Sequence, residues 1–163
     1  MKRIAILGST GSIGRSTESV VESHPGRFQI VTLAAGNNVD RVLEQAQRWK
    51  PRLISMSTPQ GADDLRKRLK SAGLTGIEVA EGSKGAVQVS TRPEVDFVVS
   101  AIVGVAGLEA TYEAVKAGKT VGLANKESLV AAGHLVMSEA KRAGATIVPV
   151  DSEHSAVFQA LWQ

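Results

Sequence analysis

The sequence contains no cysteine, so disulfides, thiolate metal sites and cysteine nucleophiles are excluded. Aromatic residues make up only 4% of the 163 residues, and no apolar run approaches the ~18 residues of a membrane-spanning helix. The formal net charge of +3 is modest, and the basic residues are spread along the chain. Because nucleic-acid sites combine a basic patch with aromatic side chains, we expect no nucleic acid as partner. The short apolar runs likewise lead us to expect no membrane as partner.

An apolar, strand-like segment begins almost at the first residue and leaves no room for a signal or transit peptide, so we expect a cytoplasmic protein. The chain has the length of one ordinary domain. Its residues are 43% hydrophobic, and most of these are Ala, Val, Ile and Leu. Such a composition is typical of a parallel sheet that is buried on both faces.

Strand-like and helix-like segments alternate along the chain. Strands are expected at residues 3–7, 28–34, 52–56, 77–80, 95–102, 120–124 and 146–150. Helices are expected at residues 11–24, 39–50, 59–72, 83–90, 107–117 and 126–143, and in the last stretch up to residue 163. Repeated β–α units with short connections predict an α/β fold with a doubly wound, mostly parallel, Rossmann-like sheet.

Three glycines, Gly8, Gly11 and Gly14, lie between the first strand and the first helix. Glycine permits a sharp turn and a close approach of the backbone to a ligand. The helix N-terminus that follows offers unpaired N–H groups and a positive dipole end to a phosphate. The spacing differs from the commoner G-x-G-x-x-G, so a purely structural turn is the alternative. Between a strand and a helix, the pattern favours a dinucleotide site.

The segment Ala35-Gly36-Asn37-Asn38 follows the second strand, where an acidic side chain binds the adenosine ribose in NAD enzymes. Between the end of this strand and Asp40 there is no acidic residue. Small and amide residues leave room for a 2′-phosphate, which favours NADP over NAD. The alternative role of Asn38 is the N-cap of the following helix.

Asn125, Lys126 and Glu127 follow the strand at 120–124. A carboxylate at a helix N-terminus, such as Glu127, is favourable without any ligand. A cation there is unfavourable, so Lys126 indicates a ligand anion or a carboxylate nearby.

Asp151 and Glu153 directly follow the strand at 146–150. In extended backbone residues i and i+2 point to the same side, so the two carboxylates converge. Both stay ionised at low cost only if a cation lies between them, and oxygen ligands suit Mg²⁺ or Mn²⁺. The alternative is an acidic helix start without metal. Two carboxylates are in any case an incomplete ligand set.

Together, four segments resemble 1-deoxy-D-xylulose 5-phosphate reductoisomerases. They are GSTGSIG at 8–14, AGNN at 35–38, LANKE at 123–127 and PVDSEH at 149–154, and SAIVG at 100–104 is also similar. Enzymes of this family rearrange a 2-keto sugar phosphate and reduce the resulting aldehyde with NADPH, which yields 2-C-methyl-D-erythritol 4-phosphate for isoprenoid synthesis. A divalent cation, Mn²⁺ or Mg²⁺, holds the substrate oxygens.

The resemblance implies a role for each matching residue. The cofactor-binding residues would be Gly8, Thr10, Gly11, Ser12 and Ile13 at the pyrophosphate, Gly36, Asn37 and Asn38 near the adenosine phosphate, and Asn125 and Glu127. The metal ligands would be Asp151 and Glu153. The small-molecule sugar phosphate would contact Lys126, Ser152 and Glu153, of which Lys126 and Glu153 would be catalytic.

Two departures from the family qualify these expectations. Members often carry a basic residue at the position of Asn37, and its absence weakens the electrostatic preference for NADPH. Family members are also much longer, and the full-length enzymes form homodimers. We therefore expect residues 1–150 to be an NADPH-binding domain and residues 151–163 the start of a truncated catalytic and metal-binding region. Such a chain should bind cofactor and show little or no turnover.

Two alternatives remain at this point. One is another NAD(P)-dependent reductase domain, similar to that of homoserine dehydrogenase, in which Asp151 and Glu153 bind no metal. The other is a nucleotide-binding module without catalysis.

Overall fold

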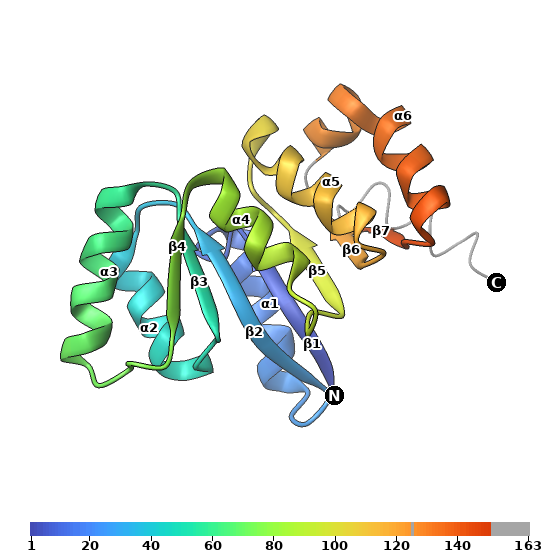
Figure 1. Cartoon of the computed structure of the whole chain (residues 1–163). Coiled ribbons are helices and arrows are strands. Elements are labelled where there is room, and N and C mark those ends of the chain that lie inside the picture. Colours follow the sequence, from blue (N-terminus) through green and yellow to red (C-terminus); the bar gives the residue numbers. More distant parts are fainter. Residues whose placement is uncertain (125, 151–163) are drawn as a thin grey trace.

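Seven parallel strands form one sheet in the part of the chain that this computed structural model describes, residues 1–124 and 126–150 (Figure 1). They are β1 (Lys2–Leu7), β2 (Phe28–Ala35), β3 (Leu53–Met56), β4 (Glu78–Glu81), β5 (Phe97–Ser100), β6 (Thr120–Leu123) and β7 (Ile147–Pro149). Their order is β4-β3-β2-β1-β5-β6-β7. The strand order reverses direction at β1, which confirms the predicted doubly wound, Rossmann-like sheet.

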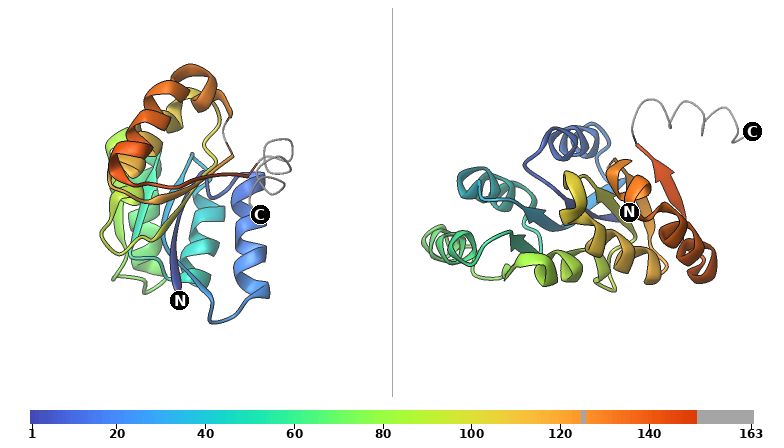
Figure 2. Two further views of the ribbon diagram at one scale, coloured as in Figure 1. Left: turned by 90° about the vertical axis from the view of Figure 1, so that its right-hand side faces the viewer. Right: turned by 90° about the horizontal axis from the view of Figure 1, so that it is seen from above.

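Helices cover both faces of this sheet (Figure 2, right). They are α1 (Ser12–Ser23), α2 (Val39–Trp49), α3 (Pro59–Ser71), α4 (Gly82–Thr91), α5 (Leu108–Lys116) and α6 (Lys126–Ala143), with a 3₁₀ turn, η1 (Gly104–Gly107), before α5. One apolar core contains side chains of α1, α2 and α3, and a second contains side chains of α4, α5 and α6. The first three helices therefore pack on one face and the last three on the other.

The central strand β1 contributes to both cores. Ile4 and Ile6 lie in the core under α1 to α3, whereas Ala5 and Leu7 lie in the core under α4 to α6. All four side chains are buried. A strand covered on both faces reads as a continuous apolar run, which is why the composition predicted a parallel sheet.

The predicted helix ends are observed for α2 and α3. The Asn38 side chain accepts a hydrogen bond of 3.0 Å from the Arg41 N–H, so it caps α2 as expected. Thr58 caps α3 in the same way through the Gly61 N–H, at 3.2 Å. Gly73 follows α3 with a φ of +73°, a left-handed conformation that favours glycine.

The strand predicted at 95–102 is shorter in the structure, since only Phe97–Ser100 pairs in the sheet. Asp96, just before β5, contacts Arg3 of β1 through both its backbone and its side chain, and its N–H donates to the Arg3 carbonyl oxygen at 2.9 Å. Its carboxylate accepts from the Arg3 backbone N–H at 2.8 Å and from the guanidinium at 2.8 and 3.0 Å. These hydrogen bonds, with the side-chain one largest, lower the pKa of Asp96 from 3.8 to about 2.

We expect the pairing of Asp96 with Arg3 to make the fold acid-sensitive. A carboxyl group with a depressed folded pKa stabilises the fold fully above its unfolded pKa, and this contribution is lost as the pH falls from near 3.8 through about 2. The effect should be modest, because both side chains are more than a third exposed, at 42% and 35%. Urea unfolding followed by circular dichroism should show Asp96→Asn less stable than the wild type at neutral pH. The gap should close as the pH is lowered through this window, and a pH-independent gap would contradict the assignment.

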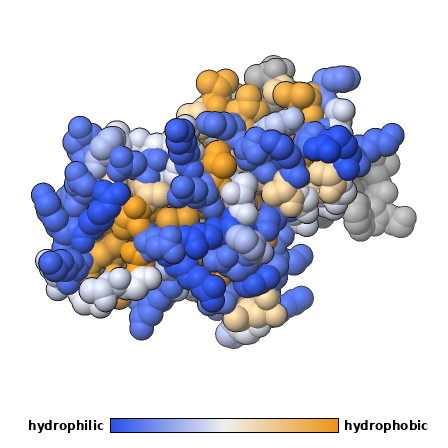
Figure 3. All heavy atoms as spheres, viewed as in Figure 1, coloured by the Kyte–Doolittle hydropathy of each residue, from blue (hydrophilic) through white to orange (hydrophobic). Residues whose placement is uncertain are grey.

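The outer surfaces of the helices are mainly hydrophilic, and apolar side chains gather near the top of the view, over the start of α5 and over α6 (Figure 3). Among the described residues, Val103 and Val105 are the most exposed of the large aliphatic side chains, at 86% and 68%. Both belong to the segment that follows the carboxyl end of β5. No helix in the described part of the chain is long and apolar enough to cross a membrane.

Candidate dinucleotide site

The segments singled out in the sequence begin at one edge of the sheet. Leu7, at the end of β1, lies opposite Ala34 of β2 and Ser100 of β5. Ser100 in turn lies opposite Leu123 of β6, which is paired with β7. Because all strands are parallel, the turns that follow β1, β2, β5, β6 and β7 leave the sheet at this same carboxyl edge. Ligands of open α/β sheets bind at this edge, at the point where the strand order reverses.

The glycine turn after β1 is held tightly between the ends of β2 and β5. Its first glycine, Gly8, has a φ of +85°, and a Cβ there would lie 2.5 Å from the Ala101 carbonyl oxygen. The N–H groups of Gly8 and Ser9 both donate to the Ala34 carbonyl oxygen, at 2.8 and 2.9 Å. Glycine at position 8 is therefore required both by its backbone conformation and by the close approach of β5.

The other two glycines have different functions. A Cβ on Gly14 would lie 2.2 Å from the Ser9 carbonyl oxygen, so glycine lets α1 pack directly on the turn. Gly11 is the N-cap of α1, in extended conformation and without a side-chain cap. The first helical hydrogen bond runs from Arg15 N–H to the Gly11 carbonyl, and the Gly11 N–H donates to the Gly8 carbonyl oxygen at 3.1 Å. The N–H groups of Ser12, Ile13 and Gly14, in the first turn of α1, have no acceptor within the helix. They form the kind of anion site that dinucleotide phosphates use.

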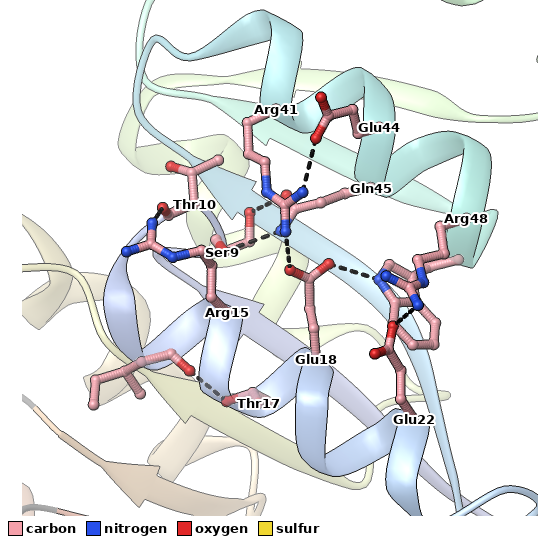
Figure 4. Close-up of polar contacts among 12 residues, drawn as sticks. Ser9, Thr10, Arg15, Thr17, Glu18, Glu22, Arg41, Glu44, Gln45 and Arg48 are labelled. Atoms are coloured by element: carbon pink, nitrogen blue, oxygen red, sulfur yellow. Dashed lines mark hydrogen bonds and ion pairs between the residues drawn. The ribbon is translucent and has the colours of Figure 1, made fainter.

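A buried glutamine of α2 fixes the turn from the other side (Figure 4). The Ser9 hydroxyl donates to Gln45 Oε1 at 2.9 Å, and Gln45 Nε2 donates to the Ser9 carbonyl oxygen at 3.0 Å. Both side chains are almost fully buried. This pair was not predicted from the sequence. A signal for it exists, because Gln45 is a polar residue on the otherwise apolar face of α2 formed with Val42 and Ala46.

A second buried contact holds α1 against α2 (Figure 4). The carboxylate of Glu18, on α1, is 5% exposed and accepts hydrogen bonds from Arg41 at 2.9 Å and from the Trp49 ring N–H at 2.6 Å. A buried carboxylate is tolerated when it is paired and hydrogen-bonded in this way. The N-terminus of α1 is thus positioned by rigid neighbours.

In the segment after β2, the side-chain amide of Asn37 is held in place by hydrogen bonds, and the space beside Gly36 is open. Asn37 Oδ1 accepts hydrogen bonds from Ser57 Oγ at 2.7 Å and from Thr58 Oγ1 at 2.9 Å. This leaves the NH₂ group of Asn37 as the donor that can meet a ligand. A Cβ on Gly36 would meet no atom within 4 Å. The predicted N-cap role of Asn38 is observed, as described above.

A pocket of about 300 Å³ opens next to this segment. It lies between the carboxyl ends of β2 and β3, the start of α4 and the segment after β5, and its lining includes Ala34, Gly36, Ser57, Ser83 and Ile102. This pocket was not predicted from the sequence. It depends on the crossover from β4 to β5, which places α4 over the opposite face of the sheet.

The side chains of the remaining predicted site residues are not among those that the structure describes. Asn125, Asp151, Ser152 and Glu153 lie outside the described residues, and for Lys126 and Glu127 only the backbone, at the start of α6, is described. The chain leading to them is placed: Ala124 N–H donates to the Ser100 carbonyl, and Val150 N–H to the Leu123 carbonyl, each at 3.0 Å. Within residues 1–124 and 126–150, no three carboxylate or histidine side chains cluster as metal ligands would.

The parallel sheet and the glycine turn at its switch point define a Rossmann-like domain. The model of the 1-deoxy-D-xylulose 5-phosphate reductoisomerase family matches residues 4–133, so the chain belongs to this family. This assignment confirms the resemblance of the four segments. It also sets aside the alternative of a homoserine-dehydrogenase-like reductase.

Known members are similar over nearly the whole chain. The chain is 52% identical over 161 residues to the 1-deoxy-D-xylulose 5-phosphate reductoisomerase of Methylococcus capsulatus, covering 99% of this chain and 41% of the relative. A solved reductoisomerase in complex with NADPH, fosmidomycin and magnesium is 45% identical, with a TM-score of 0.95, over 99% of this chain and 39% of that one. For the Zymomonas mobilis enzyme in complex with NADPH the identity is 40% and the TM-score 0.90, over 97% and 41% of the two chains. The chain thus spans about two fifths of its relatives' length.

Proposed function

We propose that residues 1–150 are the NADPH-binding domain of a metal-dependent reductoisomerase and that residues 151–163 begin its catalytic and metal-binding region. The full enzyme would convert 1-deoxy-D-xylulose 5-phosphate to 2-C-methyl-D-erythritol 4-phosphate in isoprenoid synthesis. One observation carries the proposal: the N–H groups at the start of α1 lie at the switch point of the sheet, in a chain 45% identical to a solved reductoisomerase with NADPH. The proposal includes the cytoplasmic location and the homodimer expected of the full-length protein.

The cofactor would lie across the carboxyl edge of the sheet. Its pyrophosphate would sit on the N-terminus of α1, against Thr10, Gly11, Ser12 and Ile13, after the turn at Gly8. The adenosine phosphate would lie at residues 36–38, where the NH₂ group of Asn37 is available as a donor. The adenine ring would enter the neighbouring pocket of about 300 Å³. Asn125 and Glu127 would contact the cofactor further along the edge.

The substrate and the metal would meet the cofactor beyond β6 and β7. Asp151 and Glu153 are oxygen donors of the kind that Mg²⁺ and Mn²⁺ prefer, which fits this group. When bound, a divalent cation supplies Lewis-acid polarisation of the substrate carbonyl. Lys126, Ser152 and Glu153 would contact and orient the sugar phosphate, with Lys126 and Glu153 as catalytic residues. The hydride chemistry belongs to the cofactor, and the protein contributes its orientation.

We expect the purified chain to bind NADPH and to show little or no turnover. Two carboxylates are only part of a divalent cation's ligand set, and a loosely held substrate loses the rate advantage of orientation. Titration of the nicotinamide fluorescence should give saturable NADPH binding. An assay with 1-deoxy-D-xylulose 5-phosphate, Mn²⁺ and NADPH should give no NADPH oxidation above the background. Efficient oxidation would show that the chain carries a complete active site, and absence of nucleotide binding would refute the proposal.

A further inference from the structure

The proposed adenosine site lacks a basic residue where the cofactor would need one. The 2′-phosphate of NADPH adds close to two negative charges to the adenosine ribose. Residues 35–38 after β2 contribute only small and amide side chains, and the next charged residue, Asp40, is acidic. A cation that binds this phosphate must therefore come from another element of the fold.

We propose that Arg15 of α1 binds the 2′-phosphate of NADPH and makes the site prefer NADPH over NADH. This inference rests on the function proposed above and names a specificity-determining residue within it. Arginine suits this role, because its planar guanidinium donates two parallel hydrogen bonds to a phosphate.

Arg15 is held over the glycine turn. Its Nη1 donates to the Thr10 carbonyl oxygen at 2.7 Å, and the side chain is exposed to solvent. Thr10 follows Ser9, which Gln45 ties to α2. Figure 4 shows the guanidinium of Arg15 beside Thr10, with α2 running alongside. Arg15 therefore lies on the turn that packs against α2, the helix that follows the proposed adenosine segment at residues 36–38. In Rossmann folds the adenosine ribose binds after the second strand, beside this turn.

Arg15 also has its charge available, unlike the other arginines of α1, α2 and α3. Within the described residues, each of the others forms an ion pair: Arg41 with Glu18 and Glu44, Arg48 with Glu22, Arg66 with Asp63 and Glu81, and Arg68 with Asp40 and Asp64. Arg15 donates only to a neutral carbonyl. An arginine already paired with two carboxylates, such as Arg41, has little net charge to offer a phosphate.

The test compares two nucleotides that differ only in the 2′-phosphate. Dissociation constants for NADPH and NADH are measured by nicotinamide fluorescence for the wild type, Arg15→Gln and the control Arg27→Gln. Arg27 is an exposed arginine at the opposite edge of the sheet, before β2, so its loss changes the net charge equally. Arg15→Gln should raise the NADPH constant about tenfold and change the NADH constant less than twofold, as expected for one charged hydrogen-bonding group. Arg27→Gln should leave both constants unchanged.

A second variant separates a specific contact from a general loss of binding. Asn37→Lys in the Arg15→Gln background returns a cation to the adenosine segment and should restore the preference for NADPH. An equal weakening of NADPH and NADH by Arg15→Gln, or no change in either, would overturn the inference while leaving the proposed function intact. If the wild-type chain binds neither nucleotide, the proposed function itself fails.

Discussion

Replacing Gly14 by alanine should destabilise the fold and reduce NADPH binding at least tenfold. The added Cβ would lie 2.2 Å from the Ser9 carbonyl oxygen, 2.5 Å from the Ser9 carbonyl carbon and 2.7 Å from the Gly8 carbonyl oxygen. These are backbone atoms, so no side chain can move to relieve the contact. Helix α1 must shift away from the turn, and its N–H groups shift with it. Overpacking of this kind costs about 1–3 kcal/mol in the free energy of unfolding.

Two other glycines provide matched controls for this prediction. A Cβ on Gly76 or on Gly36 would meet no atom within 4 Å, and neither residue has a positive φ. Gly76→Ala should change neither stability nor binding. Gly36→Ala should leave the urea unfolding curve unchanged and weaken NADPH, because Gly36 lies in the proposed adenosine site. If Gly14→Ala unfolds and binds like Gly76→Ala, the close packing of α1 on the turn is not needed.

Gln45→Leu should lower the free energy of unfolding by about 2–4 kcal/mol, because it removes two buried hydrogen bonds and leaves the Ser9 hydroxyl and carbonyl without partners. We also expect weaker NADPH binding, since the turn that presents the α1 N–H groups is then less well fixed. Urea unfolding gives the stability. The dissociation constant is measured well below the unfolding temperature, where the variant is folded.

Gln47 lies two residues further along α2 and is exposed, so Gln47→Leu is the control for the same chemical change. It should affect neither measurement. The double variant Ser9→Ala/Gln45→Leu should lose less stability than the sum of the losses measured for the two single variants, because the two residues share their hydrogen bonds. Full additivity would mean that the Ser9–Gln45 contact contributes no coupling energy.

The parts of the fold that local patterns encode could be predicted closely from the sequence. The N-cap Asn38, the Pro59 start of α3 and the glycine turn are each recognisable from a few neighbouring residues, and all are observed. The strand at 95–102 was predicted too long. Its apolar residues suggest pairing throughout, whereas the strand comprises Phe97–Ser100. The ion pair of Asp96 with Arg3 of β1 was not predicted, because the two residues are 93 positions apart. A pattern within one segment contains no information on such a partner.

In the candidate site too, features encoded by neighbouring residues could be predicted, and contacts between distant residues could not. The three glycines of the turn and the asparagines Asn37 and Asn38 could be proposed as site residues from the sequence, because each has a local chemical signature. Gln45 and Glu18 were missed, because their contacts depend on which helix packs beside α1. The pocket of about 300 Å³ also could not be predicted, since its walls come from β2, β3, α4 and the segment after β5.

By itself, the sequence determined the alternation of strands and helices, the burial of the sheet on both faces, the position of the glycine turn and, through four short segments, the family. Each of these depends on residues close together in the chain. Only the tertiary structure decided which groups hold that turn and which charges are left unpaired around it. The physical reason is that hydrogen bonds and ion pairs depend on distances in space, and the parallel crossovers bring together side chains that are far apart in sequence, such as Ser9 and Gln45.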